Sequence, residues 1–142
     1  MAKIKKHTLT FENDYAYDLI GICSHYGDYR LVWSINEQLN THFERGTELF
    51  LVSGRKGNDA AGFPYYAFQE EDNRLEMYLI KNKYEGKFLI PEKQQIDYFL
   101  FVCDNFTVDI DDWVETLRSL PGVMAAYAFD PATFTSTEQI IF

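Results

Sequence analysis

The stretch IDYFLFVC, residues 96–103, decides the fold because it is apolar on both of its faces. In an extended strand, alternate side chains point to opposite sides of the sheet. Here one side carries Ile96, Tyr98, Leu100 and Val102, and the other carries Phe99, Phe101 and Cys103. Strands of this kind are covered on both faces and lie inside a sheet. The sequence therefore predicts that residues 96–103 form a central strand.

The preceding segment, FLIPEKQQ (residues 88–95), brings the chain to that strand. Pro91 fixes its own φ angle and favours extended geometry at the residue before it. Glu92 and Asp97 are two carboxylates that flank the turn. We favour a structural interpretation, in which Glu92 accepts backbone N–H bonds within the turn, Asp97 caps the strand entry and Tyr98 anchors the strand. The alternative is an acid–base pair, which requires a shared cleft and separated pKa values.

Further strands and helices surround this central strand in a simple order. Strand patterns cover residues 17–24, 47–53, 63–70, 74–84 and 123–130 and, as a candidate edge strand, 7–11. Helical patterns cover residues 29–43 and 110–120, and Asp28 and Asp109 are their expected N-caps.

The resulting order is β-α-β-β-β-β-α-β. Without its central hairpin it is the βαββαβ order of a ferredoxin-like sandwich. We therefore expect a single α+β domain over residues 1–142, with an antiparallel sheet of about five to six strands and two helices on one face. Residues 134–142 either add an edge strand or pack on the surface. The closing segment LRSLPGVMAAYAFD, residues 117–130, resembles the helix-to-strand junction of ACT-type regulatory domains.

A second resemblance covers more of the chain. IPEKQQIDYFL, residues 90–100, is similar to the signature of the bacterial IPExxxVDY family. The matching positions are Ile90, Pro91, Glu92, Asp97 and Tyr98, and Ile96 stands where the family name has valine. DYRL at residues 28–31 and AAYAFD at residues 125–130 look like the family pattern as well. The resemblance implies a single intracellular bacterial domain and implies no activity.

The net charge restricts the partners that this chain can bind. It has 22 Asp and Glu against 13 Lys and Arg, which gives a formal net charge of −9. Binding to phosphate backbones works through their neutralisation by Lys and Arg, so the composition disfavours DNA, RNA and anionic membranes. No segment has the run of about 20 apolar residues that a membrane span requires. We therefore expect a cytoplasmic protein with neither nucleic acid nor membrane as its partner.

Side chains that could hold a metal or act as nucleophiles are scattered along the chain. Cys23 and His25 share one face of the first predicted strand, and Cys103 ends the central strand. A structural zinc site needs four N or S ligands, and the C-x₂₋₄-C spacing is absent, which leaves a Cys–His nucleophile pair as the alternative. GRKGNDAAG, residues 54–62, lacks the G-K-[ST] of a phosphate-binding loop. The sequence predicts no metal and no cofactor.

The predicted sheet has more apolar surface than two helices can cover. If both helices lie on one face, the other face carries some of the large apolar side chains of the strands: Phe99, Phe101, Tyr78, Tyr65, Tyr66 and Met124. Monomers rarely expose contiguous apolar patches beyond a few hundred Å². We therefore predict a non-enzymatic domain that self-associates through this face, most simply as a twofold dimer, or binds a protein partner there. In the alternative, the extra strands and the C-terminal segment fold over it.

Two other functions stay open at this point. One is a small-molecule regulatory module of the ACT type, whose ligand would bind near Tyr26, Gly27 and Asp28, where the first helix begins. The other is an enzyme that uses either of the two side-chain pairs described above. No complete catalytic motif supports the enzyme.

Overall fold

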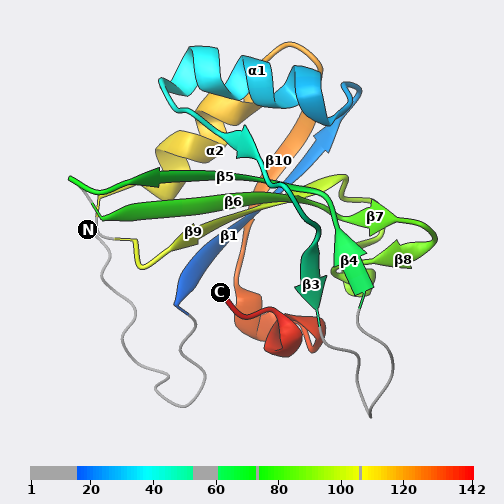
Figure 1. Ribbon diagram of the computed structural model, residues 1–142. Coiled ribbons are helices and arrows are strands. Elements are labelled where there is room, and N and C mark those ends of the chain that lie inside the picture. Colours follow the sequence, from blue (N-terminus) through cyan, green and yellow to red (C-terminus); the bar gives the residue numbers. More distant parts are fainter. Residues whose placement is uncertain (1–15, 53–60, 73, 106) are drawn as a thin grey trace.

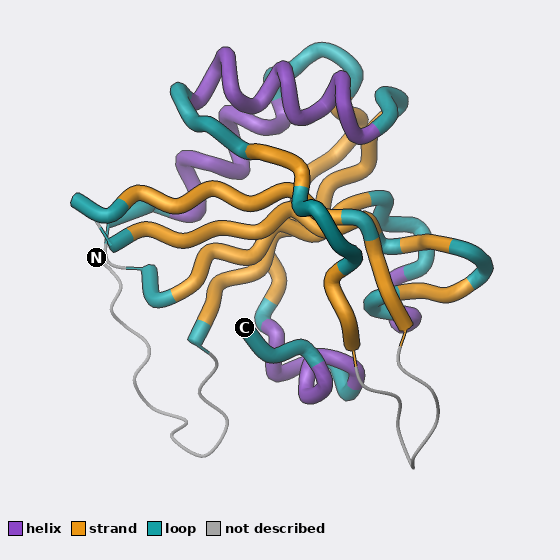
Figure 2. Tube along the Cα trace, in the orientation of Figure 1, coloured by secondary structure: helices purple, strands orange, loops and turns teal. Residues whose placement is uncertain are grey.

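The computed structural model describes residues 16–52, 61–72, 74–105 and 107–142 (Figures 1 and 2). Its main element is a six-stranded sheet in the order β10-β1-β9-β6-β5-β2, and every neighbouring pair is antiparallel. The strands are β1 (Tyr17–Ser24), β2 (Glu44–Arg45), β5 (Tyr65–Glu70), β6 (Leu75–Lys81), β9 (Tyr98–Cys103) and β10 (Val123–Phe129). The predicted central strand is confirmed, because β9 lies between β1 and β6 and all six of its residues are buried.

The two helices, α1 (Asp28–Leu39) and α2 (Ile110–Arg118), cover one face of this sheet (Figure 1). Their buried side chains pack on alternate residues of the central strands, including Ile20, Met77 and Leu100. The second helix begins as predicted, since the Asp109 side chain accepts the backbone N–H of Asp112 at 3.2 Å. The expected α+β class with an antiparallel sheet and two helices is therefore confirmed.

The first helix is shorter than the sequence pattern predicts. It ends at Leu39 because Asn40 takes the left-handed conformation with φ of 56°, which asparagine tolerates better than most residues. The Asn36 side chain then accepts the backbone N–H of Phe43 at 2.9 Å and the hydroxyl of Thr41 at 2.8 Å. The prediction that the helix continues to residue 43 is wrong, and Phe43 instead packs against Phe68 from the segment after the helix.

The other face of the sheet is covered by irregular segments. The hairpin of β3 (Phe50–Val52) and β4 (Ala61–Phe63) and the hairpin of β7 (Lys83–Tyr84) and β8 (Lys87–Phe88) form small sheets of their own. The C-terminal segment follows β10 to the side of the sheet opposite the helices (Figures 1 and 2). It contains two short 3₁₀ helices, at Pro131–Thr133 and Ser136–Gln139, and adds no edge strand.

The expectation of an uncovered aromatic face is therefore wrong. Phe99 and Phe101 are 0% exposed, and the Phe142 ring lies 5.1 Å from that of Phe101 and 4.7 Å from that of Tyr78. The C-terminal segment and the hairpins fold over this face, which was the alternative interpretation. Residues 47–53 accordingly do not join the main sheet, because their described part pairs with β4.

The remaining interface candidates are distributed over different surfaces. Tyr66 lies in the core between the sheet and the helices, so its assignment to the opposite face is wrong. Tyr65 and Tyr78 are half-buried on the side of the C-terminal segment. Met124 is exposed on the edge strand β10. The predicted strand at residues 7–11 and residues 54–60 of the glycine-rich loop lie outside the described residues.

Among the described residues, neither α1 nor α2 has the length and apolar character needed to cross a membrane.

Candidate functional site

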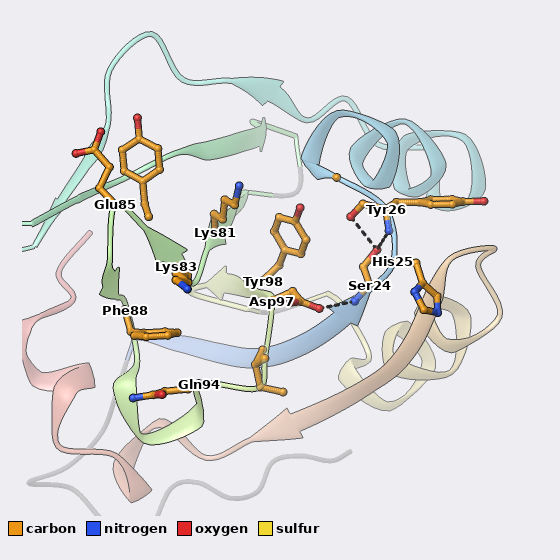
Figure 3. Close-up of a pocket in the computed structure, with 13 residues that line it drawn as sticks. Ser24, His25, Tyr26, Lys81, Lys83, Glu85, Phe88, Gln94, Asp97 and Tyr98 are labelled. Carbon is orange, nitrogen blue, oxygen red and sulfur yellow. Dashed lines mark hydrogen bonds between the residues drawn. The ribbon is translucent and has the colours of Figure 1, made fainter.

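A cavity of about 630 Å³ opens beside the N-terminus of α1 (Figure 3). Its walls are the end of β1, the segment from the end of β6 through β7, and the chain that enters β9. Cavities of this size are typical of small-molecule sites. We take this pocket as the candidate functional site.

A tight turn leads from β1 into the helix at the mouth of the pocket. The Ser24 hydroxyl accepts the backbone N–H of Tyr26 at 2.9 Å and donates to its carbonyl at 3.2 Å. The Tyr26 ring packs against Gly122, whose φ is 85° and whose Cβ, if present, would lie 2.6 Å from that ring. Gly122 therefore meets two demands that no other residue satisfies together. The turn places Gly27, the N-cap of α1, against the pocket.

Asp28 does not cap α1, contrary to the sequence prediction. It is the first residue of the helix, and its carboxylate accepts the backbone N–H of Tyr29 at 2.8 Å. The same carboxylate lies 3.6 Å from the guanidinium of Arg45 in β2. Asp28 thus connects the start of α1 to β2, which is the edge strand at the other end of the sheet from β10. Gly27, the N-cap residue, has no side chain to cap the helix.

Asp97 joins β1 to the start of β9. Its carboxylate accepts the backbone N–H of Ser24 at 2.8 Å, and its own N–H donates to the carbonyl of Ile22 at 3.0 Å. The side chain therefore binds the neighbouring strand instead of capping the entry of its own strand. This contact fixes Asp97 in the pocket wall next to Tyr98.

Asn82 holds the loop that enters β9. It is fully buried, its amide NH₂ donates to the carbonyls of Lys93 (2.9 Å) and Ile96 (2.8 Å), and its amide oxygen accepts the N–H of Ile90 (2.9 Å). Its backbone N–H also donates to the Asp97 carbonyl at 2.9 Å. Buried polar groups are stable when all of them are paired in this way. The role of Asn82 was not predicted, because its partners lie 8 to 14 residues further along the chain.

Tyr98 directs its hydroxyl into the pocket (Figure 3). The residue is 5% exposed, and within the described chain its hydroxyl has no hydrogen-bond partner. Burial raises the pKa of Tyr98 most, and the nearby charges of Asp28 and Asp97 raise it further. The phenol therefore stays protonated at neutral pH and is available as a hydrogen-bond donor.

Two lysines, Lys81 on β6 and Lys83 on β7, line the same pocket as Tyr98. Lys81 is directly across the β6–β9 ladder from Tyr98, and Lys83 lies with its ammonium 5.7 Å from the centre of the Phe88 ring. In the described parts of the chain neither lysine takes part in an ion pair. The pocket also contains the carboxylates of Asp97 and Glu85, so charges of both signs line it (Figure 3). Neither lysine was among the binding residues predicted from the sequence.

Glu92 lies in a different place. Its carboxylate accepts the backbone N–H groups of Thr135 (2.8 Å) and Ser136 (3.0 Å) and the Ser136 hydroxyl (2.7 Å). Burial favours a higher pKa for Glu92, but the hydrogen bonds from Ser136 and Thr135 outweigh it and lower the pKa. Glu92 does accept backbone N–H bonds, and besides its own N–H these come from Thr135 and Ser136 of the C-terminal segment. Because Asp97 binds β1 instead, the two carboxylates do not form an acid–base pair.

The cysteines also fail to form a reactive site. Cys103 pairs with Tyr17 at the start of β1, whereas Cys23 pairs with Ala125 near its end. Burial raises the pKa of Cys103 to about 12 and also raises that of Cys23, which is opposite to the requirement for a nucleophilic thiolate. Within the described residues, no group of three or more His, Cys, Asp or Glu side chains is arranged to hold a metal ion.

The structure thus gathers four of the predicted binding residues, Tyr26, Gly27, Asp97 and Tyr98, in one pocket. Asp28 lies next to it, and Glu92 is elsewhere. In comparisons with known proteins, no family model, no curated protein and no solved structure matches this chain. The resemblance to the IPExxxVDY family stays a prediction, and the function has to be inferred from the pocket itself.

Proposed function

We propose that this protein is a non-enzymatic domain that binds a small organic anion, a carboxylate or a phosphate, in the pocket beside α1. One observation carries the proposal. Lys81 and Lys83, without ion-pair partners in the described chain, share a cavity with the hydroxyl of Tyr98, which forms no hydrogen bond within the described residues. An anion would give all three donors charge-assisted hydrogen bonds.

The local charges favour an anion although the whole chain is acidic. Asp97 already accepts a backbone N–H from Ser24, which partly satisfies its charge. The N-terminus of α1 lies at the same wall, but its partial positive charge is offset there by the Asp28 carboxylate, which accepts the N–H of Tyr29, so the two lysines carry the attraction for an anion. Glu85 and Asp97 would then select ligands that also carry a donor group, such as an amine or a hydroxyl. The ligand class is therefore a small anion with a second, hydrogen-bond-donating group.

The arrangement of elements supports a more specific form of the proposal. We include in the proposal a ferredoxin-like core to which β5 and β2 are added; the order β10-β1-β9-β6, with α1 after β1 and α2 between β9 and β10, supports it. The pocket adjoins the turn where an ACT-type module would bind its ligand. We therefore include in the proposal a regulatory, ACT-like role, membership of the IPExxxVDY family and a cytoplasmic location.

The test is a binding experiment with matched lysine variants. Thermal unfolding of the wild type is followed with a panel of amino acids, hydroxy acids and sugar phosphates, since a ligand that prefers the native state raises the melting temperature. For any compound that does so, we expect Lys81→Gln and Tyr98→Phe to weaken binding by about tenfold or more. Lys87→Gln, which removes the same charge from β8 outside the pocket, should bind as the wild type does.

Two results would overturn the proposal. In the first, no compound of the panel stabilises the protein. In the second, a compound binds, but with equal affinity to the wild type and to the Lys81→Gln and Tyr98→Phe variants. Circular dichroism of each variant distinguishes lost binding from a lost fold.

A further inference from the structure

The outward side of α1 carries two large aromatic side chains. Tyr29 is 76% exposed and Trp33 is 59% exposed. They lie four residues apart, so they are neighbours one turn along the same side of the helix. The opposite side of α1 is buried on the sheet through Leu31 and Ile35. The solvent side of such a helix is normally polar, and tryptophan and tyrosine are among the residues that contribute most to protein interfaces.

Two opposite charges flank Trp33 on this outward side. Arg30 precedes Trp33 by three residues and Glu37 follows it by four, and both are exposed. With 3.6 residues per turn, Arg30 and Glu37 lie about 60° and about 40° around the helix axis from Trp33, in the same direction. Both charges therefore stand along one edge of the aromatic side, one before Trp33 and one after it.

Arg30 and Glu37 take part in no ion pair within the described residues. The Arg30 guanidinium stacks on the Tyr26 ring, with 4.1 Å between its Cζ and the centre of the ring. Stacking uses the flat side of a guanidinium and leaves the N–H groups at its edge free to donate. Tyr26 thus holds Arg30 beside the helix without satisfying its hydrogen bonds.

We propose that α1 packs against α1 of a second copy of this chain, antiparallel and about a twofold axis beside Trp33. This rotation reverses the helix direction but keeps the charged edge on the same side, so Arg30 of each copy meets Glu37 of the other. The two exposed Trp33 rings meet at the centre. The occupant is a second copy because the charges are complementary to their own twofold image. None of Tyr29, Arg30, Trp33 and Glu37 lines the ligand pocket, so the dimer does not depend on the proposed function.

The size of this contact sets the strength of the dimer. Each copy contributes one side of a helix of 12 residues. Interfaces below about 1,200 Å² belong to weak, reversible complexes. We therefore expect a dissociation constant on the order of 100 µM. The protein is then a monomer at the low-micromolar concentrations of unfolding experiments and a dimer at millimolar concentration.

The first test exchanges the two charges and measures the mass by sedimentation equilibrium. Arg30→Glu makes both positions acidic and Glu37→Arg makes both basic, so in either variant like charges meet across the axis. We expect each variant alone to associate at least about tenfold more weakly than the wild type. An equimolar mixture of the two should give a mixed dimer of twice 16.6 kDa, because every contact then joins opposite charges. Lys87→Glu, the same charge change on β8, is the matched control and should dimerise as the wild type does.

The fluorescence of Trp33 gives a second measurement. Trp113→Phe leaves Trp33 as the only tryptophan, and its emission should move to shorter wavelength as the protein concentration rises, because the ring leaves water. The proposal is wrong if the wild type stays a monomer with unchanged emission at millimolar concentration, which would leave this face to a protein of different sequence. It is also wrong if the mixed charge variants associate no better than each variant alone, as they would in a dimer formed through another surface.

Discussion

The two faces of the sheet are covered by different kinds of segment. The backbone N–H and C=O groups of these segments find their hydrogen-bond partners in different ways. On one face, α1 and α2 bury apolar side chains while most of their N–H and C=O groups pair within the helix itself. On the other, the cover is two short hairpins, the loop before β9 and the C-terminal segment (Figure 1). Segments without long regular structure need partners for their backbone groups from elsewhere.

Two polar side chains supply those partners on the irregular face. Asn82 binds three backbone groups of the loop that enters β9, and Glu92 binds the first turn of the helix at Ser136–Gln139. On the helical face, capping residues such as Asp109 accept hydrogen bonds from the free backbone N–H groups at the start of a helix. The irregular face therefore depends on single polar side chains that bind backbone groups 8 to 44 residues away in the sequence. The helical face depends mainly on the apolar side chains of α1 and α2.

The largest expected effect tests whether the two faces are packed equally well. Leu100 and Phe101 are neighbours on β9, fully buried, and point to opposite faces. We expect Leu100→Ala to reduce the free energy of unfolding by about 3 kcal/mol and Phe101→Ala by about 4 kcal/mol, measured by urea denaturation. Leu51→Ala, at an exposed position, should change it by less than about 0.5 kcal/mol. A much smaller effect at Phe101 would mean that the C-terminal segment packs loosely.

The next largest expected loss of stability is at Asn82, the buried polar residue that holds the loop before β9 on the irregular face. Asn82→Ala leaves the N–H of Ile90 and the carbonyl of Ile96 without their side-chain partner in a buried environment. We expect a loss of about 3 kcal/mol in the free energy of unfolding. The matched control is Gln94→Ala, an exposed amide in the same loop, with an expected change below about 0.5 kcal/mol. Equal stability of the two variants would contradict the role assigned to Asn82.

The helical face could be predicted from the sequence because its signals are local. Leu75, Met77 and Leu79 alternate along β6, and Asp109 stands just before the apolar stripe of α2. The end of α1 could not be placed in this way, since it depends on Asn36 accepting hydrogen bonds from Thr41 and Phe43 after the helix. That contact forms only when the chain leaves the helix.

The cover of the irregular face carries no such signal. Phe134, Ile140 and Phe142 pack on the sheet, but their spacing fits neither a helix nor a strand. Without that information, the aromatic residues of β9 looked exposed. The expectation of a sheet-face interface followed from this error.

The pocket was half predictable for a related reason. Asp97 and Tyr98 stand where the turn after Pro91 leads into the apolar strand, and Tyr26 stands in the turn that ends β1, so the local sequence was sufficient to select them. Lys81 enters the pocket because the β6–β9 register sets it opposite Tyr98. Register between strands that are separated by a long loop is a property of the whole sheet, and the sequence around each strand does not determine it.

The smallest expected change in the free energy of unfolding is that of Glu92→Gln, which removes the charge of this side chain but keeps its size. The folded protein lowers the pKa of Glu92, so its carboxylate stabilises the fold above the unfolded pKa of about 4.3. That contribution is lost as the pH falls through the lower, folded pKa. We expect Glu92→Gln to reduce the free energy of unfolding by about 1 kcal/mol at neutral pH, and the difference from the wild type should vanish in acid.

A control variant distinguishes this contact from a general effect of charge. Glu37→Gln makes the same charge change on the exposed side of α1, away from the C-terminal segment. In a chain with net charge −9, removal of either carboxylate relieves some repulsion and should act in the opposite direction. If both variants have the same stability at every pH, Glu92 does not hold the C-terminal segment. If only Glu92→Gln is destabilised and only near neutral pH, the irregular face depends on this carboxylate in a way that the helical face does not.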